Sequence, residues 1–106
     1  MNKFGLSEKI IILLTEFFQK QPEIETVIIF GSRATGNFKN SSDIDFAIIG
    51  KDIDFKFIQH ISSEIDELST PYMYDIVDYN TITNDKLREN IDNFGKIFYQ
   101  KSYNEQ

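Results

Sequence analysis

The chain has 106 residues, of which 41% are hydrophobic and 14% aromatic, and it carries a formal net charge of -6. This length and composition predict a single globular domain over residues 1–106, because the chain can bury one core and no composition break marks a linker. The acidic balance argues against nucleic acid as a direct partner, and the lack of cysteine excludes disulfides, thiolate nucleophiles and Cys-based zinc sites.

The first half of the chain predicts one helix followed by two strands. Apolar residues recur at helical spacing over residues 7–19, with Ser7 as the N-cap. After Pro22, the segment IETVIIF at residues 24–30 is rich in β-branched residues and reads as a strand. Residues 31–42 form a loop that can include a helical turn beginning at Ser32, and residues 43–49 form a second strand. The two strands make a hairpin-like unit with a long connection.

The second half predicts a helix, a strand, a helix and a short edge strand. Asp54 caps a helix that ends near Ser69, and Pro71 leads into a strand at residues 73–79. Asn84 caps a last helix that stops at Gly95, and KIFYQ at residues 96–100 is a short final strand. This order of elements predicts an α+β (mixed α/β) fold, with helices packed on a small mixed sheet.

Two aspartates in the second strand point to a metal site. Side chains alternate along a strand, so Asp43 and Asp45 share one face about 7 Å apart. Their mutual repulsion is relieved by a hard divalent cation with oxygen ligands, which suggests magnesium. An Asp-x-Asp pair by itself is more often a solvated strand end. Gly31 and Ser32, however, directly follow an apolar strand, where backbone N–H groups can approach phosphate oxygens.

A third carboxylate is expected on the strand at residues 73–79, which offers two candidates. Asp75 shares its face with Met73 and Val77, whereas Asp78 lies on the opposite face, so at most one of the two joins the first pair. We choose Asp75 because it is farther from the strand end. Such a set of acids suits a two-metal site for phosphoryl chemistry.

The two cations between the glycine and the aspartates have no assigned role. Arg33 and Lys39 lie in a segment without acids, so each either contacts phosphate or is solvated surface. His60 stands on a helix with no second histidine nearby and is assigned no function. Aromatic candidates for a partner surface are Phe17, Phe18, Phe55, Phe57 and Tyr72.

The segment GSRATGNFKNSSDID, residues 31–45, resembles the signature of the DNA polymerase β-type nucleotidyltransferase superfamily: Gly-Ser, ten residues, then Asp-hydrophobic-Asp. The short length and the segment PYMYDIVDY most resemble the minimal nucleotidyltransferases found as antitoxins beside HEPN-domain toxins. This resemblance covers nearly the whole chain. It implies the polymerase β palm-like fold and transfer of AMP from ATP to a tyrosine of a cognate HEPN toxin.

The resemblance also implies roles for particular residues. Gly31, Ser32 and Ser42 would bind the nucleotide. The metal ligands and catalytic acids would be Asp43, Asp45 and Asp75, with Mg²⁺ as cofactor and ATP as substrate. Thr35 departs from the pattern, because many members carry Arg before the second glycine of the loop, and this bears on the phosphate contacts.

Two other functions stay open at this stage. The chain could be a non-catalytic antitoxin that neutralises its toxin by forming a complex, or a nucleotidyltransferase with another acceptor. The longest apolar run near the N-terminus, residues 10–14, is too short for a membrane span and unlike an export signal, so we expect the protein in the cytoplasm.

Overall fold

The computed structural model describes residues 3–102. Its elements are α1 (Glu8–Gln19), β1 (Ile24–Phe30), α2 (Ser32–Thr35), β2 (Ile44–Gly50), α3 (Phe55–Asp66), β3 (Tyr74–Asp78), the 3-10 helix η1 (Tyr79–Thr81), α4 (Asp85–Phe94) and β4 (Lys96–Gln100). The predicted types and order of elements are confirmed, including the short helical turn that begins at Ser32. Strand β2 begins one residue later than predicted, so Asp43 directly precedes the strand instead of lying in it.

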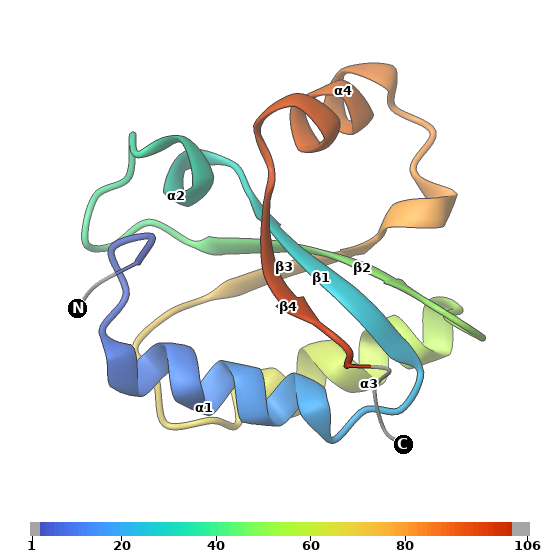
Figure 1. Ribbon diagram of the computed structural model, residues 1–106, viewed down its shortest axis with the longest axis horizontal. Helices are drawn as coiled ribbons and strands as arrows, with labels where there is room; N and C mark the ends of the chain where they lie inside the picture. The colour runs from blue at the N-terminus through green and yellow to red at the C-terminus, as the bar shows by residue number, and fades with distance from the viewer. Residues whose placement is uncertain (1–2, 103–106) are drawn as a thin grey trace.

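The strands form one mixed sheet in the order β3-β2-β1-β4. Strand β1 pairs antiparallel with β2 and with β4, which confirms the hairpin-like unit, whereas β2 pairs parallel with β3. A parallel pair needs a crossover connection, and α3 supplies it. Helices α1 and α3 cover one face of the sheet, while α2 and α4 lie on the other (Figure 1).

The three longer helices start at the predicted capping residues. The Ser7 hydroxyl accepts a hydrogen bond from Ile10 N, and the Asp54 carboxylate accepts one from Phe57 N at 2.8 Å. The Asn84 side chain accepts from Leu87 N. Each cap satisfies a backbone donor that the first helical turn leaves unpaired.

Helix α3 ends at Asp66, earlier than the predicted end near Ser69. The N–H groups of Glu67 and Leu68 donate to the carbonyls of Glu64 and Ile65, three residues back, so the last turn tightens and the helix stops. Leu68 still packs against the core, which explains why its apolar character extended the predicted helix.

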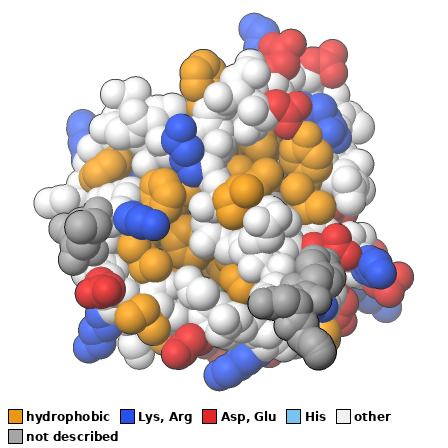
Figure 2. Space-filling view, viewed as in Figure 1, with side chains coloured by type: hydrophobic (Ala, Val, Ile, Leu, Met, Phe, Trp, Pro, Cys, Tyr) orange, Lys and Arg blue, Asp and Glu red, His pale blue; other side chains and the backbone are white. Residues whose placement is uncertain are grey.

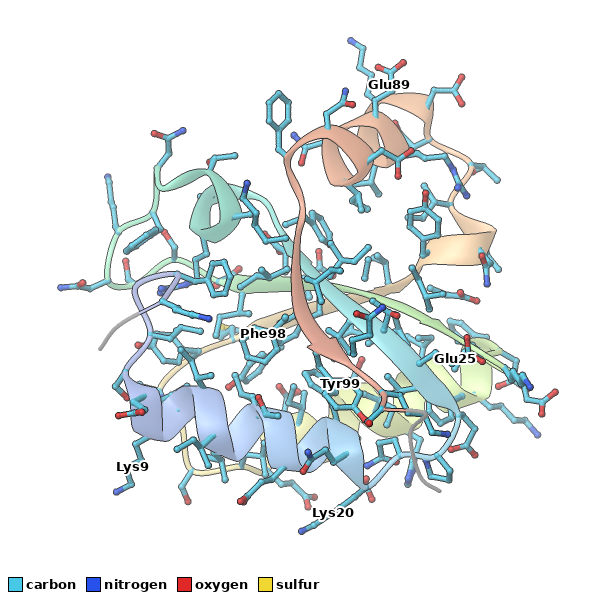
Figure 3. The ribbon with its side chains drawn as sticks, in the orientation of Figure 1. Lys9, Lys20, Glu25, Glu89, Phe98 and Tyr99 are labelled. Atoms are coloured by element: carbon cyan, nitrogen blue, oxygen red, sulfur yellow. The ribbon has the colours of Figure 1, made fainter. Side chains whose placement is uncertain are left out.

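The main core lies between the sheet and helices α1 and α3. Phe18 of α1 is fully buried and packs its ring edge-on against Phe46 of β2, with the centroids 5.2 Å apart. Figure 3 shows Phe98 and Tyr99 on β4 above α1, and both rings contact Phe18. Lys9 and Lys20 project away from α1 in the same view, as an amphipathic helix requires. Phe17 and Phe18, two aromatic candidates for a partner surface, are therefore core residues.

A second, smaller core lies on the opposite face of the sheet. Phe30, Ala47 and Ile91 are its buried members, so α4 is held against β1 and β2. Gly31, which follows β1, and Asp45, near the start of β2, lie next to this cluster. Within residues 3–102, no helix is long and apolar enough to cross a membrane.

Candidate functional site

The register of the sheet brings Asp45 and Asp75 side by side. In the parallel pair of β2 and β3, Asp45 lies opposite Asp75, and in the antiparallel pair of β1 and β2 it lies opposite Phe30, the residue before Gly31. Phe46 points into the main core, so Asp45 faces the side of the sheet that carries α2 and α4. Three separate segments of the chain thus meet at one carboxylate.

The Asp45 carboxyl group is half-buried and surrounded by like charge. Burial, and then the charges of Asp75 and Asp43, raise its pKa from 3.8 to about 6. Asp43 and Asp75 are both exposed. The charges of Asp43 and Asp75 therefore act on Asp45, and Asp45 is the one of the three predicted acids that is partly buried.

Asp78 occupies a different place. It is buried to 9% exposure, and its carboxylate accepts a hydrogen bond from Asn80 N at 3.1 Å, which caps η1. It pairs with Ile48, a main-core residue, so it lies on the opposite face from Asp45 and Asp75. The structure therefore brings Asp75, and not Asp78, beside the Asp45 carboxylate.

Gly31 meets the Asp45 carboxylate from the end of β1. Its backbone has φ +75°, and a Cβ added there would lie 2.4 Å from Asp45 Oδ2. The positive φ favours glycine, and a side chain at this position would also have to displace the Asp45 carboxylate. Helix α2 starts at the next residue, Ser32, and ends at Thr35; the φ of +89° at the following residue, Gly36, lets the chain turn back toward β2.

The rest of the loop is organised by Ser42 and Arg33. The Ser42 hydroxyl accepts a hydrogen bond from Lys39 N at 2.8 Å, and its carbonyl accepts two from the Arg33 guanidinium. Arg33 is only 2% exposed, so it is neither of the two things expected for it, a phosphate contact or solvated surface. Lys39 is exposed.

A cleft of about 790 Å³ opens beside Gly31 and Ser32. One wall comes from the end of β1 and α2, and the other comes from α4 and the start of β4. The lining residues are Gly31, Ser32, Ala34, Thr35, Asn37, Asn90, Phe94 and Lys96. No acid is among them, and Lys96 is the one cation. Figure 2 shows hydrophobic side chains clustered on one face of the molecule. Phe94 and Ile97 are more than half exposed.

Sequence reasoning missed Asn90, Phe94 and Lys96. Strand β4 pairs with β1 so that Lys96 lies opposite Ile29, two residues before Gly31, although the two positions are far apart in the chain. No motif marks these three residues. The one available signal was the predicted edge strand at residues 96–100, whose partner the sequence did not specify.

The carboxylates offer the right donor type for magnesium, but they do not form a ready-made cluster. Across residues 3–102, no three His, Cys, Asp or Glu side chains are grouped to hold a metal ion. Asp43 and Asp75 are exposed and can turn toward Asp45, and an all-oxygen donor set suits Mg²⁺. A cation there would also offset the burial and the charges of Asp75 and Asp43, which together raise the pKa of Asp45.

A second hollow lies at the other end of the sheet. It has a volume of about 600 Å³ between the start of α3, the end of β3 and α4, and its apolar lining includes Phe55, Ile58 and Leu87. Phe55 is 74% exposed and Phe57 is partly buried. Tyr72 packs against Arg33. Of the five aromatic candidates for a partner surface, Phe55 is thus the most accessible.

Comparison with known proteins identifies the family. The family described as "Polymerase beta, Nucleotidyltransferase" matches residues 13–104. The chain belongs to the polymerase β nucleotidyltransferase family. This nucleotidyltransferase is also 35% identical over 80 residues to a probable protein adenylyltransferase, MntA, of Haemophilus influenzae, covering 74% of this chain and 69% of that protein.

Solved structures share the fold of this nucleotidyltransferase. A toxin-antitoxin complex with AMP-PNP matches with a TM-score of 0.70 and 20% identity, over 90% of this chain and 75% of that chain. A tri-AMPylated HEPN toxin of Shewanella oneidensis in complex with an MNT antitoxin matches with a TM-score of 0.51 and 24% identity, over 88% and 68%. The predicted mixed α+β nucleotidyltransferase fold and the resemblance to minimal nucleotidyltransferases are confirmed.

Replacing Asp45 with Asn is expected to stabilise the metal-free nucleotidyltransferase near pH 7, because folding disfavours the charged form of this carboxyl group. Between pH 3.8 and about 6 the folded chain binds more protons here than the unfolded chain. The protonated Asp45 carboxyl group therefore contributes its full stabilisation below pH 3.8, and this contribution is lost as the pH rises through about 6. Urea unfolding in EDTA near pH 7 and near pH 4 should show the Asn variant's advantage shrinking toward acid.

Asp52→Asn is the matched control for that measurement. Asp52 is exposed, and its φ of +58° is one that Asn also adopts. Its stability difference from the parent at the two pH values is the baseline for the loss of one exposed charge, against which the D45N difference is compared. A D45N variant less stable than the parent near pH 7 would contradict the raised pKa.

Proposed function

We propose that this nucleotidyltransferase is an antitoxin that transfers AMP from ATP to a tyrosine hydroxyl of a cognate HEPN-domain toxin. The observation that carries the proposal is the meeting of Asp45, Asp75 and Gly31 at one point, with Asp43 directly before the strand. Support also comes from the relative described as a probable protein adenylyltransferase and from the fold shared with toxin-antitoxin complexes.

The reaction forms one bond and breaks one. The tyrosine oxygen attacks the α-phosphorus of ATP, an O–P bond to AMP forms, the bond between the α- and β-phosphates breaks, and pyrophosphate leaves. We assign Asp75 to accept the hydroxyl proton, because it is exposed and lies beside Asp45 at the sheet end. Asp43, Asp45 and Asp75 would hold Mg²⁺. When bound, Mg²⁺ neutralises charge on the triphosphate and on the attacking oxygen.

We place the triphosphate in the cleft beside α2. Gly31 lacks a side chain and Ser32 offers a hydroxyl group, so phosphate oxygens can approach the backbone there. Ser42 is not among the residues that line this cleft, although its hydroxyl still has a proton to donate while it accepts from Lys39 N. Lys96 faces this wall from β4 and supplies the positive charge that Thr35 lacks.

The acceptor site is open, which fits a protein substrate. The cleft and the carboxylates lie at the surface of a small domain, with Asp43 and Asp75 exposed to solvent. A domain of this size has little room for an acceptor pocket of its own, so the toxin itself would complete the cleft. This is also why we expect a stable complex with the toxin.

Incubation of the cognate HEPN toxin with this chain, Mg²⁺ and ATP should increase the toxin's intact mass by one or more AMP units. The Asp43→Asn/Asp45→Asn double variant should give no increase, because the proposed metal site loses two charged ligands. Intact-mass spectrometry makes the measurement. A stable complex without any mass gain would indicate a non-catalytic antitoxin, and AMP appearing only on another protein would indicate a different acceptor.

Asp75→Asn and Asp78→Asn should differ in their effect on AMP transfer. We expect D75N to lower the rate of AMP transfer about 100-fold or more with little loss of stability, because it removes an exposed proton acceptor. D78N should change the free energy of unfolding by less than about 0.5 kcal/mol, because the Asn side-chain oxygen can still accept the Asn80 N–H bond that caps η1, and should leave the transfer rate near the parent value. The reverse pattern would assign the third acid to Asp78.

Lys96→Ala should raise KM for ATP about tenfold with a smaller effect on kcat, because it removes a charge-assisted contact to the phosphates. Lys39→Ala is the matched control: Lys39 is also exposed but does not line the cleft. Initial rates of AMP transfer at varied ATP concentration test both variants. Equal KM values for K96A and K39A would remove Lys96 from the proposed nucleotide site.

A further inference from the structure

Arg33 is a buried arginine whose hydrogen bonds all go to backbone carbonyls. It is 2% exposed although it lies on a four-residue surface helix. Its Nη1 donates to Phe4 O at 2.9 Å, and its Nε and Nη2 both donate to Ser42 O, at 3.2 and 2.9 Å. Longer bonds from Nη2 reach the carbonyls of Lys39 and Asn40. The guanidinium therefore joins two segments that have no strand pairing with each other.

The charge of Arg33 is balanced without a carboxylate. Among the residues that the structure describes, no acid forms an ion pair with it; its guanidinium lies 5.1 Å from the centroid of the Phe38 ring and 4.8 Å from that of Tyr72. Aromatic faces and carbonyl dipoles offset the cost of burying the charge. The planar fork of five N–H donors matches this set of acceptors, whereas the ammonium of lysine does not.

The segments that Arg33 holds lead directly to the acids. Residues 39–42, which we call the 39–42 turn, run into Asp43 and strand β2, and Tyr72 is followed by Met73 and strand β3. The starts of these two strands are joined by a hydrogen bond from Ile44 N to Met73 O at 2.9 Å. The next residue of β2, Asp45, lies opposite Asp75. Phe4, whose carbonyl accepts from Arg33 Nη1, lies in the N-terminal turn of residues 3–6. Figure 1 shows this turn beside the loop that follows α2. The turn is the third segment that the guanidinium contacts.

We infer that Arg33 is a positioning residue for the carboxylate site: its guanidinium clamps the 39–42 turn and Tyr72, and so sets where Asp43 and Asp45 stand relative to Asp75. Arg33 does not touch the nucleotide, because its donors are directed into the protein and its side chain is buried. The catalytic part of this inference rests on the proposed function. The structural part concerns only the geometry of this chain.

The test compares Arg33→Lys with Arg88→Lys. Arg88 is the matched control: its guanidinium lies 4.6 Å from the Tyr79 ring and donates to the carbonyls of Tyr79 and Ile82, in a part of the chain away from the acids. Each substitution keeps the charge and removes the planar fork. Differences between the variants therefore report the place of the arginine and not the loss of an arginine in general.

The first readout is amide hydrogen exchange followed by NMR. The Ser42 amide donates to Lys39 O and the Ile44 amide donates to Met73 O, so these two amides monitor the clamp directly. We expect R33K to speed their exchange about tenfold or more relative to the amides of β1, which report global unfolding. R88K should change neither ratio. A uniform change across all amides in R33K would mean general destabilisation and would overturn the inference.

The second readout is AMP transfer by folded protein. We expect R33K to lower kcat about 10- to 100-fold with KM for ATP nearly unchanged, because misplaced carboxylates slow the reaction more than they weaken nucleotide binding. R88K should stay within about twofold of the parent. A kcat for R33K equal to that of R88K, or a fall in kcat without faster exchange of Ser42 and Ile44, would overturn the positioning role.

The two readouts separate this inference from the proposed function. A parent that transfers no AMP overturns the proposed function and the catalytic part of the inference together, while the exchange measurement still decides whether Arg33 clamps the turn. If R33K does not fold, Phe38→Leu keeps the arginine and removes one of its two rings. That variant should show the same selective exchange to a smaller extent, and unchanged exchange would overturn the clamp.

Discussion

The parallel pairing of β2 with β3 is the constraint on which the site depends, because it sets Asp45 opposite Asp75. Parallel neighbours cannot be joined by a tight turn, so α3 must cross over, and the buried faces of both strands hold the register. A shift of one residue in β3 would move Asp75 to the core face and bring Ile76 outward. The hydrophobic pattern of β3 therefore protects the position of the acid as well as the stability of the sheet.

The cost of that arrangement is concentrated on Asp45. It lies between two other acids and against Gly31, half-buried, and its pKa is raised to about 6. A fold selected for stability alone would place a neutral residue there. Residues that weaken the metal-free fold and suit a cation and a phosphate are typical of functional sites. Gly31, whose positive φ favours glycine and which lies against this carboxylate, supports the same interpretation.

Residues from the middle of the chain and from both of its ends form the site. The glycine loop and Asp45 come from the β1–β2 unit, while Lys96, Phe94 and Asn90 come from α4 and β4. Arg33 adds the N-terminal turn to the same assembly through Phe4 O. An open cleft of this kind, on a domain of this size, suits a substrate that is itself a folded partner.

Much of the fold was predictable, because its signals are local. Runs of β-branched residues marked β1 and β2, Ser7, Asp54 and Asn84 marked helix starts, and the spacing from Gly31 to Asp45 carried the family resemblance. Alternation along β3 also separated Asp75 from Asp78. Each of these depends on neighbours within a few residues, where backbone geometry fixes which side chains share a face.

What only the tertiary structure decided depends on contacts between distant segments. The burial of Arg33 requires Phe4 and Tyr72 to meet it from either side, and the cleft requires Lys96 to lie opposite Ile29. A sequence lists an arginine or a lysine without stating which carbonyls or strands will surround it. The sequence by itself therefore determined the acids, the glycine and the order of elements, whereas packing decided which charges face the cleft and which hold it in place.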